Sequence, residues 1–336
     1  MILEYLKIAR SFNAALTGLA PVMGALATGQ YQIGSLFLLF LIGVFGHAYG
    51  FTHNDIIDYS LDKNEKEIKD RPLISGTITK RNAWIFAMGS LCVVFILALF
   101  LSFSTNQYLP VFILFIPILC VTLYNLTSKK IVFADILLGI GMFFFIFYGA
   151  IAQGTPVDKL PILVWVICLL GAIQVLFMNI VEGGFKDIGN DARQKAHTVA
   201  VRLGLRVIET KIHVPLRFKF IAYTLQITNI LFAYLPFLII PNFKIRSTLV
   251  IFQLISITLI SILMLNYAQK YLNLIQFERG KIRKLIGIHY YLNFLLAPIL
   301  LLTITPYAIL IVFIPGIGFI ISNLILHEKL MEPSVM

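Results

Sequence analysis

Acidic side chains recur at helical spacing in the segment HNDIIDYSLD, directly after a long apolar stretch. Asp55, Asp58 and Asp62 are three and four residues apart, so on a helix they share one face, with Asn54 at its edge. Carboxylates this close repel one another, and near hydrocarbon each is costly to desolvate. Mg²⁺, which is commonly held by carboxylates, water and substrate phosphates, offsets both costs. We therefore predict that these four residues are metal ligands; the alternative is a solvated helix end.

A second acidic cluster, EGGFKDIGND, contains Glu182, Asp187 and Asp191. The two aspartates are four residues apart, about one helical turn, and they follow Gly183 and Gly184, which would loosen the helix. One such pair is weak evidence, but two acidic clusters after corresponding apolar stretches explain more than a chance helix end does. Two carboxylate groups facing each other can bridge a diphosphate through Mg²⁺ ions, which stabilise charge on a leaving group. We therefore predict that Asp187 and Asp191 complete the metal site.

Basic side chains that could bind the diphosphate lie close to both clusters. Arg71 precedes Pro72, which favours an extended backbone, and its planar guanidinium matches phosphate oxygens. The predicted diphosphate-binding residues are Lys69, Arg71, Tyr124, Lys129 and Lys186. The alternative for each is a basic anchor at the membrane surface, and we favour that alternative for Lys80, Arg81 and Lys130.

The elements that position these residues are membrane-spanning helices. Of the 336 residues, 59% are hydrophobic and 13% are charged, and the apolar residues fall in runs of about twenty, long enough to cross a bilayer. Spans are predicted near 11–29, 34–57, 82–103, 107–126, 132–153, 160–182, 218–240, 247–269, 285–304 and 307–326. Pro306 and Pro315 leave open whether the last two are separate spans, so the expected fold is an all-α bundle of nine or ten spans.

The distribution of basic residues predicts the orientation of the chain. With the N-terminus in the cytoplasm, every Lys and Arg except Lys159, Lys219, Lys244 and Arg246 falls on an inner segment. The net charge of +11 therefore reports topology rather than nucleic-acid binding. The cysteines Cys92, Cys120 and Cys168 have no metal-ligand spacing and are expected to pack as small apolar residues.

The two acidic clusters divide the chain into two similar halves, each with an acidic helix end followed by a long cytoplasmic loop. These loops, 58–81 and 183–217, are expected to cap a site between the halves. We expect one membrane domain over residues 1–330 and a short tail at 331–336.

The motifs resemble those of the UbiA superfamily of intramembrane prenyltransferases. The stretches that match are Asn54–Asp62, Lys69–Gly76 and Asp187–Gly204, and the order of spans is similar over residues 5–305. The resemblance implies a helical bundle with a central cavity open to lipid, and Mg²⁺ that binds a prenyl diphosphate whose allylic carbon an acceptor attacks. It makes Asn54, Asp58, Asp187 and Asp191 the principal metal positions, with Asp55 and Asp62 supporting. The residues with predicted catalytic roles are Asp58, Asp191, Arg71 and Lys129.

Three residues are candidates for the reaction cavity. Asn13 resembles an asparagine that lines the chamber in this superfamily, although a helix-packing amide would look the same. Tyr49 could face a passing cation, and His53 could orient the acceptor or simply be bonded to a neighbour.

The chain also departs from the superfamily pattern. Lys129 stands five residues after Tyr124, where a spacing of four is common, and Gly183 replaces an aspartate that often precedes the second pair. Glu182 is the candidate substitute for that missing ligand.

The predicted function is Mg²⁺-dependent transfer of a prenyl group inside the membrane. An aromatic quinone precursor is the favoured acceptor, and a glycerol-phosphate lipid is the other. One alternative is transfer of a sugar phosphate to a polyprenyl phosphate carrier, which the same metal site would serve. A transporter is less favoured, because it would place its charges near the bilayer midplane. The sequence leaves prenyl chain length and oligomeric state open.

Overall fold

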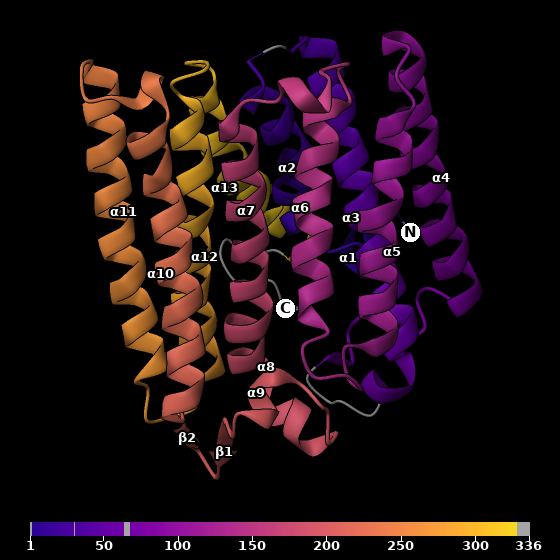
Figure 1. Ribbon diagram of the computed structural model, residues 1–336. Coiled ribbons are helices and arrows are strands. Elements are labelled where there is room, and N and C mark those ends of the chain that lie inside the picture. The colour runs from indigo at the N-terminus through magenta and orange to yellow at the C-terminus, as the bar shows by residue number, and fades with distance from the viewer. Residues whose placement is uncertain (1, 30, 64–67, 328–336) are drawn as a thin grey trace. The chain divides into compact units, whose positions relative to one another are not determined.

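Apolar helices make up most of the described chain in this computed structural model, which describes residues 2–29, 31–63 and 68–327 (Figure 1). Two compact units can be distinguished. Unit 1 comprises residues 1–126, 144–160 and 310–336, and unit 2 comprises residues 127–143 and 161–309. The predicted tail, 331–336, lies outside the described residues.

Unit 1 is built around a long helix, α3, which packs against α2 and α4. The final residues of α6 also belong to this unit. Its elements are α1 (Ile2–Ile8), η1 (Ser11–Asn13), α2 (Ala14–Ala27), α3 (Ile33–Asp62), α4 (Lys80–Thr105), α5 (Leu109–Thr127), the end of α6 (Asp135–Ile151), η3 (Val157–Lys159) and α13 (Ala308–His327).

Glycine allows α2 and the end of α6 to touch through their backbones. A Cβ at Gly149 would lie 1.8 Å from the carbonyl oxygen of Pro21, and one at Gly24 would lie 1.9 Å from that of Ile146. Real side chains cannot make such contacts. The close crossing of these helices therefore depends on glycine at both positions.

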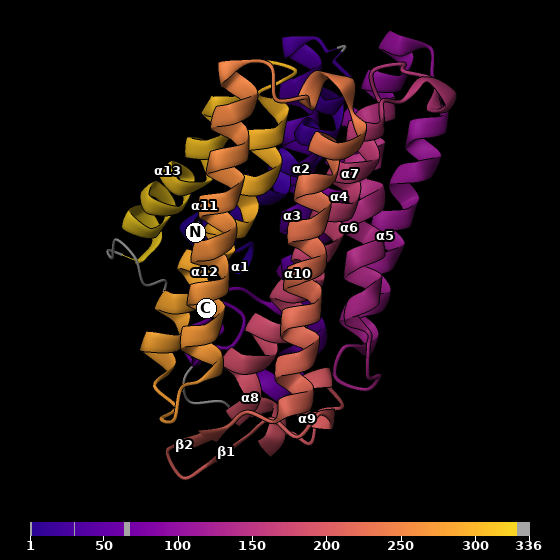
Figure 2. The ribbon, with the colours of Figure 1, turned by 60° about the vertical axis from the view of Figure 1, so that its left-hand side comes forward.

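Unit 2 contains the second acidic cluster within one long helical stretch, Ile162–Arg193. After α9 the chain forms an antiparallel hairpin in which Val207 pairs with Ile212. Figure 2 shows this hairpin beside α8 and α9, below α10. The elements are the start of α6, α7 (Ile162–Phe177), the π-helical η4 (Met178–Gly183), α8 (Gly184–Arg193), α9 (Val199–Arg202), β1 (Arg206–Ile208), β2 (Lys211–His213), α10 (Leu216–Ile239), η5 (Pro241–Phe243), α11 (Thr248–Leu272) and α12 (Arg279–Leu301).

The helices agree with the predicted spans. Among the described residues, eight helices are long and apolar enough to cross a membrane, and the shorter apolar helices Ser11–Ala27 and Asp135–Ile151 match the first and fifth predictions. α12 and α13 are separate helices, so 285–326 contains two spans rather than one. The chain is thus a multi-pass membrane protein. Apart from the small hairpin, the all-α prediction is confirmed.

Two predicted loops are more helical than expected. α3 continues through Asp62, where the Lys63 amide donates to the Tyr59 carbonyl at 3.1 Å, so the loop predicted at 58–81 begins only after this helix. The segment 183–217 holds α8, α9 and the hairpin. Hydropathy detects only the apolar part of a helix, which ends at the membrane surface. Helical backbone hydrogen bonding continues beyond that surface, so hydropathy alone predicts that these helices end too early.

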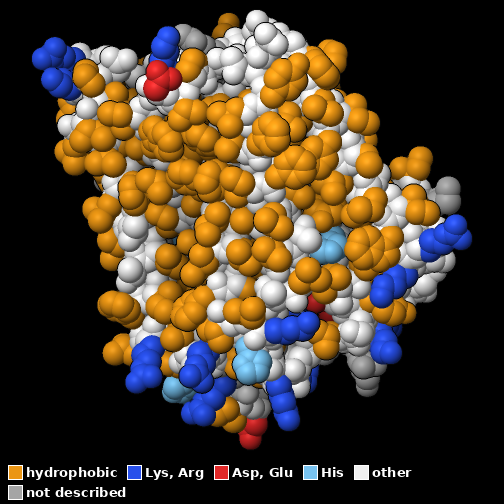
Figure 3. Space-filling model, turned by 45° about the vertical axis from the view of Figure 1, so that its right-hand side comes forward, with side chains coloured by type: hydrophobic (Ala, Val, Ile, Leu, Met, Phe, Trp, Pro, Cys, Tyr) orange, Lys and Arg blue, Asp and Glu red, His pale blue; other side chains and the backbone are white. Residues whose placement is uncertain are grey.

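The outer surface suits contact with lipid. Hydrophobic side chains cover most of the face shown in Figure 3. On α4 and α5, for example, Phe100, Phe103 and Phe112 are each more than 60% exposed. Aromatic groups this exposed would be unfavourable in water over so wide an area, but not in a bilayer.

Candidate active site

The first acidic cluster forms a single face at the end of α3, within unit 1. Arg71 joins its two ends, because its Nη1 lies 2.8 Å from Asp62 Oδ2 and 3.6 Å from Asp55 Oδ1. Between them, Asn54 Nδ2 donates to Asp58 Oδ2 at 3.2 Å. Asp55 is only 6% exposed, so its charge needs a partner close by. Arg71 is one such partner, and it links Asp55 to Asp62 along this face.

A tight loop holds Arg71 in place. The Arg71 carbonyl accepts from the Ser75 amide at 2.8 Å, and the Pro72 carbonyl accepts from the Ile78 amide at 3.0 Å. Leu73 and Ile78 are buried in a hydrophobic cluster that includes residues of α1, α3 and α4. The sequence after the first motif thus folds into an anchored support for one guanidinium group.

Arg10 is a second cation on this face, although no motif near it in the sequence indicates that role. Its Nη2 lies 2.9 Å from Asp55 Oδ1, and its guanidinium carbon lies 4.9 Å from the centre of the Phe51 ring. Its backbone is left-handed, with φ 47°, between α1 and η1. That conformation costs about 1 kcal/mol for a residue with a side chain. The ion pair and ring contact offset this cost and keep the cation directed at Asp55.

The predicted cavity residues Tyr49 and His53 contact α5. Tyr49 Oη lies 2.7 Å from Thr122 Oγ1, and His53 Nδ1 lies 3.0 Å from Asn125 Nδ2. The two rings stack with centroids 5.6 Å apart. These bonds hold α3 against α5, whereas the cluster's carboxylates are held by arginines.

Three other predicted residues of unit 1 lie on η1, on α5 and between α3 and α4. Asn13 is half-buried, and in the described structure its side chain does not cap α2. Tyr124 is half-buried near the end of α5. Lys69 is exposed and forms no ion pair within the described residues. The structure therefore brings Arg71, but not Lys69, to the acidic face.

In unit 2 the second cluster has its own cations. Asp191 is 3% exposed, and its Oδ1 lies 2.7 Å from Lys129 Nζ. The Lys129 carbonyl in turn accepts from the His197 amide at 3.0 Å, which ties the loop before α6 to the chain after α8. Asp135, in the first turn of α6, interacts electrostatically with both Asp191 and Lys129. Sequence spacing could not reveal Asp135, because it lies far from the motif in the chain.

Asp187 is more open than Asp191. Its side chain is 36% exposed, with Arg279 Nη2 at 3.2 Å and Lys186 Nζ at 3.6 Å from its carboxylate oxygens. Arg279 begins α12, 92 residues away in sequence. From the sequence, Arg279 is expected only to lie on an inner segment, as most basic residues do.

Glu182 is turned toward a different partner. Its Oε1 lies 2.6 Å from His289 Nδ1, and both side chains are buried. The structure therefore does not place Glu182 with Asp187 and Asp191, and the suggestion that it replaces the aspartate missing at Gly183 has no support from this contact.

The oxygen ligands of the site suit Mg²⁺ only when substrate phosphates complete its coordination shell. Among the described residues, no three His, Cys, Asp or Glu side chains lie close enough to hold a metal ion by themselves. Each unit instead presents a pair of hard oxygen ligands: Asn54 with Asp58, and Asp187 with Asp191. Mg²⁺ usually takes one or two carboxylates and completes its shell with water and substrate phosphates. These pairs fit that pattern.

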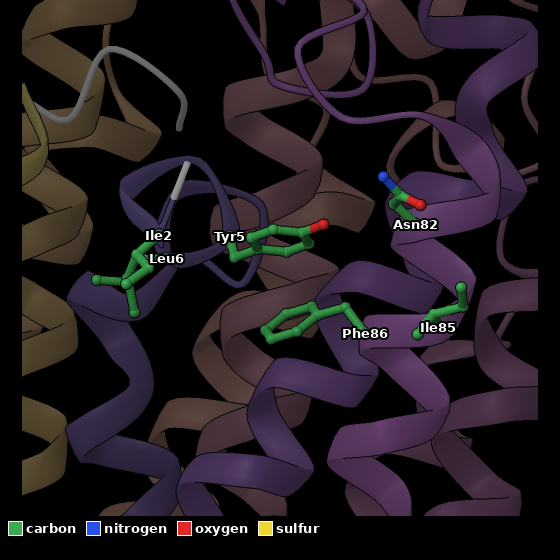
Figure 4. A pocket seen from close by; sticks show the side chains of 6 residues that line it. All are labelled: Ile2, Tyr5, Leu6, Asn82, Ile85 and Phe86. Atoms are coloured by element: carbon green, nitrogen blue, oxygen red, sulfur yellow. The ribbon is translucent and has the colours of Figure 1, made fainter.

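A groove of about 410 Å³ lies between α1 and α4. Figure 4 shows Tyr5 and Phe86 side by side there, with Asn82 and Ile85 on the α4 side. Its lining is largely apolar and includes none of the predicted site residues.

Known proteins with similar sequences and folds support one family. The model of the UbiA prenyltransferase family matches residues 14–273. Digeranylgeranylglyceryl phosphate synthase of Thermococcus gammatolerans is 30% identical over 219 residues, 60% of this chain and 70% of that protein. The enzyme of the same name from Pyrococcus furiosus is 34% identical over 116 residues, 32% of this chain and 41% of that protein, less than two thirds of its length.

Solved structures share the fold. A UbiA homologue from Aeropyrum pernix superposes with a TM-score of 0.65 at 14% identity, covering 94% of this chain and 98% of that one. A UbiA homologue from Archaeoglobus fulgidus, bound to GPP and Mg²⁺, gives 0.58 at 18% identity, covering 88% and 98%. Since the family model covers most of the sequence, the chain belongs to the UbiA prenyltransferase family.

Proposed function

We propose that this prenyltransferase transfers a prenyl group from a prenyl diphosphate to a glycerol-phosphate lipid, with Mg²⁺ bound between diphosphate and aspartates. One observation carries the proposal. The carboxylates Asp55, Asp62, Asp187 and Asp191 each lie against a Lys or Arg that can instead bind phosphate. Both clusters thus combine metal ligands with diphosphate ligands, as binding of a metal diphosphate requires.

Asn54, Asp58, Asp187 and Asp191 would hold the metal, with Asp55 and Asp62 supporting through their arginines. When bound, Mg²⁺ would neutralise the diphosphate and so favour its departure. The Archaeoglobus fulgidus homologue, which holds GPP and Mg²⁺, supports the choice of ion.

The cations of the site would exchange partners when substrate binds. Lys129, which lies against Asp191, would turn to the diphosphate as metal takes over the carboxylate. Arg71 would do the same from Asp62, and Arg279 from Asp187. Such preformed pairs keep the charges in position before substrate arrives, so little reorganisation is needed during reaction.

The reaction would break the bond between the allylic carbon and the diphosphate oxygen, with the bonding electrons leaving on the diphosphate. An acceptor hydroxyl would then form the new carbon–oxygen bond, and its proton would pass to the released diphosphate. Apolar helices around the site would keep water from the allylic cation. Asn13 is proposed to line the cavity, whereas Tyr49 and His53 are better explained as supports of α3, given their bonds to α5.

The acceptor is the part of the proposal that relatives inform most. The sequence motifs favour an aromatic quinone precursor, but the relatives described above are named digeranylgeranylglyceryl phosphate synthases. Their names favour a glycerol-phosphate lipid as acceptor. We further propose that the N-terminus and the site face the cytoplasm, as the basic residues predicted.

The experiment is a product assay on the purified protein in lipid nanodiscs. Geranylgeranyl diphosphate and Mg²⁺ are supplied with geranylgeranylglyceryl phosphate, a hydroxybenzoate, a naphthoate or a polyprenyl phosphate with a nucleotide sugar, and products are identified by mass spectrometry. Asp58→Asn and Asp191→Asn serve as matched inactive controls. A prenylated glycerol phosphate would support the proposal. A prenylated aromatic product would refute the proposed acceptor but not prenyl transfer. A sugar phosphate product would refute prenyl transfer itself.

A further inference from the structure

A carboxylate and an imidazole meet inside unit 2 among apolar side chains. Glu182 is 3% exposed and His289 is fully buried, with 2.6 Å between Oε1 and Nδ1. Phe177 stacks on the imidazole with ring centroids 4.8 Å apart, and Tyr271 meets it edge-on at 6.0 Å. Polar groups buried this deeply are unfavourable unless they are bonded. The proposed mechanism uses neither residue, so the pair needs another explanation.

The pair lies at an irregular point in the helix that carries the second motif. Helical structure is continuous over Ile162–Arg193, but Met178–Gly183, which contains Glu182, is π-helical. A π-helical hydrogen bond spans one residue more than an α-helical one, and one residue of an α-helix corresponds to about 100° of rotation about the axis. This turn therefore sets the direction in which Asp187 and Asp191 leave the helix.

One neighbouring helix holds both parts of this stretch. From α12, His289 bonds to Glu182 in the π-helical turn, and Arg279 forms an ion pair with Asp187 in α8. Short π-helical turns are rare and less favourable than α-helix. The buried bond to α12 is thus well placed to retain this one.

We propose that Glu182 and His289 are positioning residues: their bond fixes the π-helical turn and thereby the direction of the two metal-binding aspartates. The catalytic consequence rests on the proposed function, but the structural consequence does not. A loosened turn would let α8 rotate, so that its carboxylates would meet the metal diphosphate less often and bind it less tightly.

The test replaces both partners at once, with Glu182→Leu and His289→Phe, because removing both leaves neither member of this bond buried without the other. The matched control is Asn229→Leu with Asn293→Leu, a buried amide pair between α10 and the same helix α12. Amide hydrogen exchange of residues 184–193 is measured without metal, and the Mg²⁺ concentration for half-maximal turnover is measured separately. In the double variant Glu182→Leu, His289→Phe we expect the amide exchange rate and the Mg²⁺ concentration for half-maximal turnover each to rise by about tenfold, equivalent to about 1.4 kcal/mol. The control should change neither.

A conservative variant separates hydrogen bonding from charge. Glu182→Gln keeps an oxygen that can accept from His289 Nδ1, so it should retain wild-type exchange and half-saturation. His289→Phe alone should raise the exchange rate and the Mg²⁺ concentration for half-maximal turnover. The comparison of these two single variants tests the positioning role if the double variant does not purify. Wild-type exchange in both His289 variants would overturn the inference, since the pair would then be core packing only. If the wild type shows no Mg²⁺-dependent turnover, the proposed function fails while the exchange measurement still tests the positioning role.

Discussion

Replacing Lys129 with methionine should separate metal binding from diphosphate binding. In the structure its ammonium lies 2.7 Å from the carboxylate of Asp191, whose side chain is 4% exposed, while the lysine side chain is 31% exposed. Hydrogen bonds to charged groups contribute about 1.5–3 kcal/mol, and the partly open lysine belongs near the lower end, about 1.5–2 kcal/mol. If substrate binding transfers this interaction to the diphosphate, Lys129→Met should weaken diphosphate binding by roughly 10–30-fold.

The same change should affect Mg²⁺ in the opposite sense. Without its ammonium partner, Asp191 is a more available anion, so Mg²⁺ without substrate should bind at least as tightly as in the wild type. The melting temperature should fall, because a buried carboxylate left unpaired costs on the order of 2 kcal/mol.

The assay is isothermal titration with Mg²⁺ alone and then with a non-reacting thiodiphosphate analogue of geranylgeranyl diphosphate. Lys130→Met is the matched control, since Lys130 is exposed and carries the same charge one residue away. Equal diphosphate affinity in Lys129→Met, Lys130→Met and wild-type protein would refute the proposed exchange of partners.

Three further predictions concern other parts of the chain. Asp58→Asn and Asp191→Asn should each lower turnover at saturating Mg²⁺ by at least about a hundredfold, as loss of a transition-state contact does, while the purified yield stays normal; near-normal rates would remove them from the metal site. Arg71→Ala should raise the KM for prenyl diphosphate by about tenfold and leave the KM for the acceptor unchanged; equal changes in both would argue for general disruption of the site. Gly149→Ala should destabilise unit 1 by several kcal/mol, because its Cβ would overlap a backbone carbonyl, whereas Gly89→Ala, with open space around it, should be neutral or slightly stabilising; equal melting temperatures would contradict the close helix crossing.

Hydropathy predicted the spans because lipid requires apolar residues over a known length. The common face of Asp55 and Asp62 followed from helical spacing in the same way, and Arg71, which contacts both, belonged to the same recognisable stretch. Each of these features is encoded over a few residues or one continuous run.

The partners of the acidic residues were harder to predict. Arg10 reaches Asp55 across 45 residues, and Arg279 reaches Asp187 across 92, so only the fold brings them together. The π-helical turn left no more sign in the sequence than two glycines. Glu182 looked like a replacement ligand because it stands beside Gly183, but that turn and His289 direct it into the core.

The central claim is that both acidic clusters bind the metal ions of one prenyl diphosphate. It is tested most directly by an experimental structure with Mn²⁺ and the thiodiphosphate analogue, in which anomalous scattering locates the ions. We predict that Asp58 of α3 and Asp191 of α8 each lie within about 2.0–2.3 Å of an ion that also binds the diphosphate. Ions bound by one cluster alone, or a diphosphate that contacts neither, would contradict the account.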